Sequence, residues 1–140
     1  MTDWKLFAIG SALFAGLTAV LAKVGVEEIP SNLATLLRTL VIVGFLCVLV
    51  AVRHEWRDPS TLNRRSVFFL VCSAIATGLS WLCYYRALQT GPASMVAPID
   101  KLSVVIAVGL SIAFLGERLD AIHGVGVLLI AAGVLILAIK

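Results

Sequence analysis

Charged side chains are scarce in this sequence. Only 14% of its 140 residues are charged, 61% are hydrophobic, and the mean hydropathy is +1.06. Soluble domains have about 25% charged and about 45–50% apolar residues. The composition therefore excludes a soluble globular domain and predicts an integral membrane protein that is surrounded by a lipid bilayer.

Cysteine and histidine are also few. The three cysteines, Cys47, Cys72 and Cys83, lie inside apolar runs without a metal-binding spacing, which argues against a metal site and predicts small buried apolar side chains. The sequence has no local nucleophile–base pair, phosphate loop or zinc motif, so we expect no enzyme, no catalytic residues and no cofactor. The net charge of +3 does not predict a nucleic-acid partner, because the basic residues flank apolar stretches rather than forming one run.

Five continuous apolar runs follow one another, each close to the roughly 20 residues that a spanning helix needs. They predict an all-α polytopic membrane protein of about five transmembrane helices, at about 4–24, 31–52, 66–90, 95–115 and 121–139, within one domain over residues 1–140. The strands of a membrane β-barrel would instead alternate with a period of two over about 10 residues. Continuous runs of this length therefore favour helices.

Short polar or glycine- and proline-containing segments separate the runs. Ser31 or Asn32 can cap the second helix, and the long polar stretch at 53–65, which includes Pro59, predicts a solvated loop. The remaining breaks are Gly91-Pro92, residues 116–120 and the terminal Lys140.

Lysine and arginine near the ends of the spans predict the orientation. Six lie on one face, where the amino terminus also lies, whereas the other face has only Lys23 and Lys140, which favours a cytoplasmic amino terminus. The six are Lys5, Arg53, Arg57, Arg64, Arg65 and Arg118. When Arg38, Arg86 and Lys101 within the spans are added to the second face, the count becomes six against five, which leaves insertion in both orientations open.

Four charged residues lie inside the apolar runs: Arg38, Arg86, Asp100 and Lys101. Because a charge in hydrocarbon costs about 2.5–3.5 kcal/mol or more, each needs an explanation. The arginines can extend to the headgroups or line a wet cavity, and Arg86 can also pair with the dipole at its helix end. If the fourth helix begins at Pro98, Asp100 is a favourable first-turn acid, whereas Lys101 gains nothing there and is the better functional candidate.

The third helix combines aromatic and polar residues. Trp81 and Tyr85 are four residues apart and share one face, where they can form part of an interfacial belt or stack on a substrate. Small residues recur in the first and last helices and predict close helix packing. They are Ser11, Ala15, Thr18 and Ala22, and Gly124, Gly126, Ala131, Ala132 and Gly133.

An ordered set of short motifs across the spans resembles the EamA family of the drug/metabolite transporter superfamily, in its single-repeat, five-helix form. The motifs are Tyr84-Tyr85-Arg86-Ala87-Leu88, Gly91-Pro92-Ala93-Ser94 leading into Ala97-Pro98-Ile99, and Leu115-Gly116-Glu117-Arg118-Leu119 before a glycine-spaced last helix. Arg38 also stands where members of the family often have an arginine in the second helix.

The resemblance implies a secondary transporter of small metabolites in the inner (plasma) membrane. Most relatives have two such repeats in opposite orientation, with a cavity between them. One repeat would therefore need a partner, either a second copy, most simply antiparallel, or a five-helix paralogue. The first helix lacks the glutamate that related four-helix exporters use, which argues against proton-coupled export of cationic drugs.

We expect Arg38, Trp81, Tyr85, Arg86 and Lys101 to bind the substrate. With Asp100, the charged candidates sum to +2, or +3 if Lys23 is added, and this favours an anionic or zwitterionic metabolite. The alternatives are a non-transporting membrane subunit or assembly partner and a component of a flippase for lipid-linked intermediates.

Overall fold

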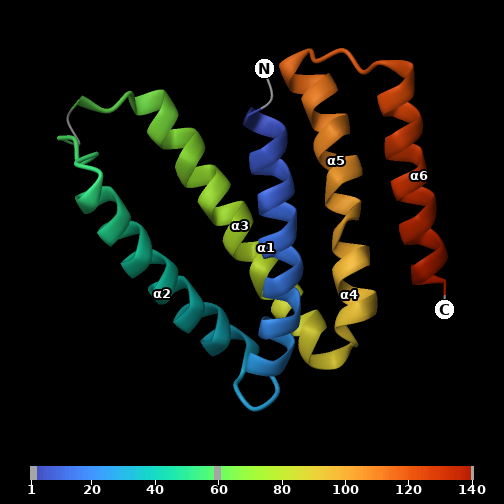
Figure 1. Cartoon of the computed structure of the whole chain (residues 1–140), viewed down its shortest axis with the longest axis horizontal. Coiled ribbons are helices and arrows are strands. Elements are labelled where there is room, and N and C mark those ends of the chain that lie inside the picture. Colours follow the sequence, from blue (N-terminus) through green and yellow to red (C-terminus); the bar gives the residue numbers. More distant parts are fainter. Residues whose placement is uncertain (1–2, 59–60, 140) are drawn as a thin grey trace. The chain divides into compact units, whose positions relative to one another are not determined.

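The structure, a computed structural model, describes residues 3–58 and 61–139, so Pro59 and Lys140 lie outside the described residues. The described residues form helices and connecting segments without a strand, and five of the helical segments are long and apolar enough to cross a membrane (Figure 1). The predicted all-α fold class is confirmed. The elements are α1 (Asp3–Gly25), α2 (Ser31–Val52), α3 (Arg64–Thr90), α4 (Ala93–Asp100), α5 (Leu102–Leu110), η2 (Ser111–Leu115) and α6 (Ala121–Ala138).

The chain divides into two compact units. The first comprises Met1–Leu21 and Gly91–Lys140, and the second comprises Ala22–Thr90. Helix α1 passes from the first unit into the second, α2 and α3 belong to the second, and α4 to α6 belong to the first.

In the second unit, α2 and α3 lie side by side (Figure 1). The core gathers where the end of α1, the start of α2 and the end of α3 meet, around the fully buried Leu88 and Val26. Tyr85, Ser31 and Thr35 are buried there as well. The buried core of this unit therefore lies at the end where polar side chains occur, and the more hydrophobic parts of its helices are exposed.

In the first unit, α4 and α5 pack against α6, and Val134 of α6 is buried. The predicted fourth helix begins at Ala93 instead of about 95, and it is interrupted at Lys101 and ends in a π-helical turn. Pro98 lies inside α4 and has no N–H to donate to the Ser94 carbonyl, and the α-helix breaks three residues after it. The turn ends at Gly116, whose positive φ of 67° favours glycine.

The amino-terminal ends of α2 and α3 differ from the prediction, α2 in its cap and α3 in its first residue. The residue before α2 is Pro30, and neither Ser31 nor Asn32 caps that helix with its side chain, so the predicted cap is wrong. Helix α3 begins two residues earlier than predicted because the Asn63 Oδ1 accepts a 2.9 Å hydrogen bond from the Arg65 N–H. At the start of α6, the Asp120 carboxylate accepts from the Ala121 N–H at 2.8 Å.

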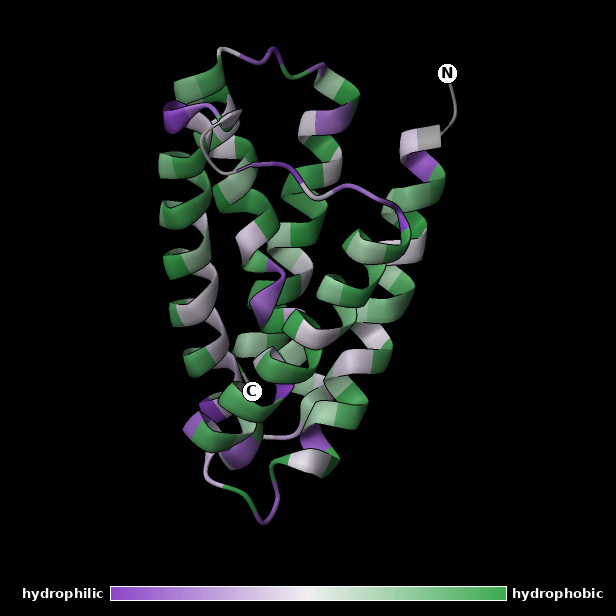
Figure 2. Ribbon diagram, turned by 90° about the vertical axis from the view of Figure 1, so that its left-hand side faces the viewer, coloured by the Kyte–Doolittle hydropathy of each residue, from purple (hydrophilic) through white to green (hydrophobic). Residues whose placement is uncertain are grey.

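The outer surface of the helices is apolar. Figure 2 shows hydrophobic residues along most of the helical ribbon and hydrophilic residues mainly in the connecting segments. Large hydrophobic side chains such as Phe7, Val41 and Ile136 are exposed, as helices in contact with lipid require. The three cysteines also lie on this surface, so the prediction that they are buried is wrong.

Candidate functional site

The second unit holds Arg38 above two aromatic rings. The Arg38 Cζ lies 4.1 Å from the centroid of the Trp81 ring and 5.7 Å from that of Tyr85. Among the described residues, no carboxylate lies within ion-pair distance of this guanidinium. The π faces of the two rings attract this guanidinium, which keeps its full positive charge.

Three of the five predicted site residues are therefore brought together. Trp81 and Tyr85 share one face of α3 as their spacing predicts, and that face points at Arg38 of α2. Arg38 is half-buried, and it lies about 10 Å along the axis from the start of α2, at 1.5 Å per residue. Its guanidinium thus remains beside the packed helices, although it carries a full charge within a predicted span.

A pocket of about 360 Å³ adjoins Trp81 between α2 and α3. Its polar lining includes Thr35 and Thr39 from α2 and Ser73 and Thr77 from α3. The three threonine hydroxyls donate to carbonyls four residues earlier in their own helices, at 2.8, 2.8 and 2.9 Å. Each hydroxyl therefore keeps its oxygen lone pairs as acceptors for a ligand.

Sequence reasoning included Thr77 among the polar residues of the third helix but overlooked the hydroxyls of Thr35, Thr39 and Ser73. Ser31, Thr35 and Thr39 recur every four residues in α2, and Ser73 and Thr77 do the same in α3. Since residues four apart share a helix face, two polar stripes could have been recognised in otherwise apolar helices. That Thr35 and Thr39 line the same pocket as Ser73 and Thr77 depends on how α2 and α3 pair.

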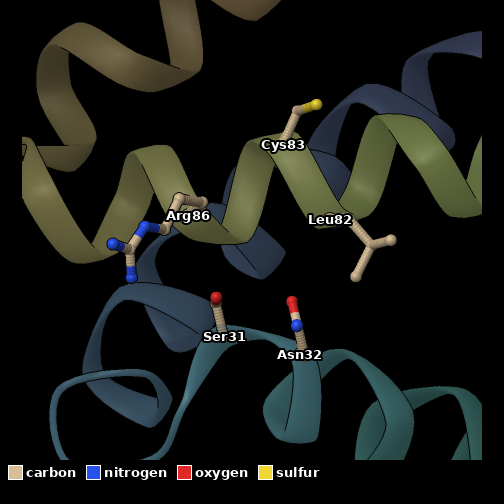
Figure 3. Close-up of a pocket in the computed structure, with 5 residues that line it drawn as sticks. All are labelled: Ser31, Asn32, Leu82, Cys83 and Arg86. Carbon is tan, nitrogen blue, oxygen red and sulfur yellow. The ribbon is translucent and has the colours of Figure 1, made fainter.

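Arg86 lines a second pocket of about 360 Å³ with Ser31, Asn32, Leu82 and Cys83 (Figure 3). Figure 3 shows Ser31 and Asn32 pointing from α2 toward α3, whereas the sulphur of Cys83 points away from α2. The exposed Arg86 guanidinium donates to Gln89 Oε1 at 3.4 Å. Arg86 is therefore available to a polar ligand from the open side of this pocket.

Lys23 and Gln89 connect the end of α3 to the preceding elements. The Lys23 Nζ donates to the Leu88 carbonyl at 2.7 Å, where its charge also complements the carboxyl end of α3. The Gln89 Nε2 donates to the Val26 and Ile29 carbonyls at 3.1 and 2.8 Å. Both side chains satisfy backbone groups, so Lys23 has a structural contact and does not need a substrate to explain its charge.

Lys101 and Asp100 belong to the first unit. The Lys101 Nζ lies 3.4 Å from the Asp100 carboxylate, with 52% and 36% of the two side chains exposed. Asp100 is the eighth and last residue of α4, so it is not the first-turn acid that a helix beginning at Pro98 would make it. The fifth predicted site residue therefore has a carboxylate partner, whereas Arg38 has aromatic ones.

The arrangement suits binding more than bond-making. The second unit offers guanidinium donors, hydroxyl acceptors and aromatic faces, which can hold charged and hydrogen-bonding groups. Among residues 3–58 and 61–139, no three His, Cys, Asp or Glu side chains gather where they could hold a metal ion.

Comparisons with known proteins agree with this chemistry. The model of the EamA-like transporter family matches residues 3–139. A protein of Sinorhizobium sp described as an uncharacterized transporter in the cobO 3′ region is 49% identical over 98% of this chain and 97% of that protein. An uncharacterized protein of Methanocaldococcus jannaschii is 30% identical over 92% of this chain and 91% of its own length.

A more distant relative has a more specific description. The probable 4-amino-4-deoxy-L-arabinose-phosphoundecaprenol flippase subunit ArnE of Proteus mirabilis is 22% identical over 70% of this chain and 87% of that protein. No solved structure matches the chain. The family match over nearly all residues confirms the resemblance seen in the sequence, and this chain belongs to the EamA-like transporter family.

Proposed function

We propose that the chain is one half of a secondary transporter for small anionic or zwitterionic metabolites and that it works as a dimer in the plasma membrane. The observation that carries the proposal is Arg38, a permanent cation within an apolar span that lies over Trp81 beside a hydroxyl-lined pocket. A charge in a span is costly, and such residues usually line a substrate pathway.

The polar groups of the second unit support a substrate that carries a negatively charged group. Arg38 and Arg86 each contribute +1, giving +2 on the facing parts of α2 and α3, and neither pocket is lined by an acidic side chain. Guanidinium groups bind carboxylates and phosphates through paired N–H donors. The threonine oxygens would accept from ammonium or hydroxyl groups, which extends the class to zwitterions and hydroxylated anions.

Arg38→Ala tests the proposal in liposomes of phosphatidylethanolamine and phosphatidylglycerol, with labelled L-serine, L-glutamate and glycerol 3-phosphate as probes. We expect wild-type protein to take up at least one probe and the variant to fall to the level of protein-free liposomes. Uptake by the variant at the wild-type rate would show that the Arg38 side chain only extends to the lipid headgroups and does not bind the substrate.

Arg65→Ala is the matched control. Arg65 is also an arginine over an aromatic ring, with its Cζ 5.9 Å from the Phe69 centroid, but it lies in the first turn of α3. Surface substitutions change free energies by about 0.5 kcal/mol, so uptake by this variant should stay within about twofold of wild type. An equal loss in both variants would point to a general effect of removing positive charge.

The dimer follows from the size of the repeat. One five-helix repeat supplies half of a cavity of the two-repeat kind, and antiparallel copies would supply both halves. The near-equal count of six against five cations is compatible with insertion in both orientations. If orientation is fixed, with the amino terminus in the cytoplasm, an oppositely oriented paralogue takes the place of the second copy.

Reporters that are active on only one side of the membrane, fused to the carboxyl terminus, test the antiparallel arrangement. We expect signal from both sides of the membrane. Signal from the outside only, with full uptake by the chain expressed by itself, would exclude the antiparallel homodimer.

A second candidate is a subunit of a lipid-linked sugar flippase. The match to a probable flippase subunit, over 70% of this chain and 87% of that protein, favours it. The liposome experiment separates the two functions. Uptake of a soluble probe by the chain supports the metabolite transporter, whereas binding of a polyprenyl phosphate without uptake of any probe supports the flippase subunit.

A further inference from the structure

The fourth span contains a break that coincides with its only charges. Residues Ala93–Leu115 form one apolar segment, and Asp100 and Lys101 are the two charged residues in it. The Lys101 N–H donates to the Pro98 carbonyl at 2.9 Å, and the Val104 N–H donates to the Lys101 carbonyl at 3.0 Å. Both are bonds over three residues, so the backbone tightens at Lys101 and the α-helical ladder changes there.

Asp100 is also the single carboxylate in the interior of the spans. The spans Trp4–Gly25, Ser31–Val52, Arg64–Thr90 and Ala121–Ala138 contain no aspartate or glutamate. The other acids occupy the connecting segments or, as Asp3, the very start of α1. If a side-chain carboxylate binds a proton during transport through this chain, Asp100 is therefore the one positioned within the membrane to do so.

The surroundings of Asp100 in its unit leave Lys101 as its charged partner. Helix α5 and the turn η2 contain no charged residue, and α6, which packs against α4, contains His123 as its single titratable group. His123 lies in the first turn of α6, with its Nδ1 3.9 Å from the carboxylate of Asp120. Among the described residues, Lys101 is the cation within ion-pair distance of the Asp100 carboxylate.

We propose that Asp100 is the coupling-proton site of the transporter and that its carboxylate and the anionic group of the substrate bind Lys101 in turn. The inference rests on the proposed function and adds the coupling ion to it. A proton from the more acidic side forms an O–H bond on Asp100, which ends the ion pair with the Lys101 ammonium. The substrate carboxylate or phosphate then pairs with Lys101. On the opposite side the substrate leaves, Asp100 loses its proton to water, and the ion pair forms again.

Charge balance at Lys101 favours this exchange, when the counted charges are those of Asp100, Lys101 and the one substrate group that Lys101 binds. The pair Asp100⁻–Lys101⁺ is neutral, and so is protonated Asp100 with a monoanionic group on Lys101. If Asp100 is protonated and no anionic group is bound, the span has a net charge of +1. If the anionic group is bound and Asp100 is not protonated, the net charge is −1. Since an unbalanced charge in the bilayer costs several kcal/mol, the two neutral states are the ones that can change access. One proton therefore moves with each anionic group.

The experiment compares wild-type protein and Asp100→Asn in liposomes that contain the pH indicator pyranine, with labelled L-glutamate, L-serine and glycerol 3-phosphate as probes. We expect wild-type protein to acidify the liposome interior when a transported probe is added outside, and to accumulate that probe when the interior is alkaline. The variant should still exchange labelled for unlabelled probe, because Lys101 remains available, but should show no acidification and no accumulation above equilibration.

Glu117→Gln is the matched control, because it makes the same chemical change in the segment just after this span and should keep both responses. Asp100→Glu retains a carboxylate and should restore acidification with an altered pH profile. Wild-type exchange without any acidification overturns the inference while the proposed function stands, and so does acidification by Asp100→Asn. The absence of exchange by wild-type protein with all three probes overturns the proposed function and this inference with it. Because the wild-type measurement is decisive, the test holds even if Asp100→Asn fails to fold.

Discussion

The two units of this molecule stabilise a cation inside an apolar span in different ways. In the second unit, Arg38 lies over the faces of Trp81 and Tyr85. In the first, Lys101 lies 3.4 Å from the carboxylate of the neighbouring Asp100. Neither a guanidinium nor an aromatic π face changes its charge at physiological pH, whereas a carboxylate can take up a proton.

Arg38 therefore has a permanent charge with fixed neighbours, whereas the partner of Lys101 can lose its charge by taking up a proton. The continuous helices α2 and α3 present Arg38 at a fixed register, which suits recognition of a substrate group. The interrupted segment formed by α4 and α5 places the Asp100–Lys101 pair at a change in backbone hydrogen bonding, which suits a change of partner. The experiments below test whether the two cations have these distinct roles.

Lys101→Ala should have the largest effect. The substitution removes the cation and leaves Asp100 with an unpaired negative charge in the span, which opposes both anion binding and insertion. We expect uptake at the level of protein-free liposomes, measured per molecule of protein recovered in the membrane.

Lys5→Ala controls for the loss of a lysine. Lys5 lies near the start of α1 with its Nζ 5.5 Å from the Trp4 ring centroid, and its removal should change uptake by about twofold or less. If Lys101→Ala and Lys5→Ala behave alike, the pair in the first unit has no special role and the comparison fails.

Much of the fold follows from the sequence because the bilayer demands long apolar helices. The predicted helix bounds lie within about two residues of those in the structure, except where the fourth span is interrupted. Pro98 signals that break, but sequence reasoning treated it as a possible helix start. A proline predicts a missing hydrogen bond, and whether the helix starts there or continues past it depends on tertiary packing.

The site was less predictable, because it depends on pairs of helices. The spacing of Trp81 and Tyr85 predicts that they share a face, but it does not predict that α2 places Arg38 on that face. Similarly, Lys23 and Gln89 bond to carbonyls that are 60 to 65 residues away in sequence, and no local pattern indicates such partners. Whether the five predicted residues bind a substrate stays a prediction.

Trp81→Phe should have the smallest effect and should sharpen the comparison most. Tryptophan holds a cation more strongly than phenylalanine does, and we take the difference as about 0.5–1 kcal/mol. That loss corresponds to a two- to fivefold fall in uptake efficiency, about 1.4 kcal/mol being tenfold. Trp81→Leu, which removes the ring, should lower uptake further, and Trp56→Phe, at an exposed residue that follows α2, should leave it unchanged.

The pH dependence of uptake distinguishes this weakening from a change in coupling. Since the Trp81 ring neither gains nor loses a proton, Trp81→Phe should lower uptake by the same factor at every pH and leave acidification per transported probe unaltered. Asp100→Glu, in contrast, should move the pH profile itself. A shifted profile in Trp81→Phe would mean that Arg38 and the Asp100–Lys101 pair act as one site, and the separation between a fixed cation and a switchable one would have to be abandoned.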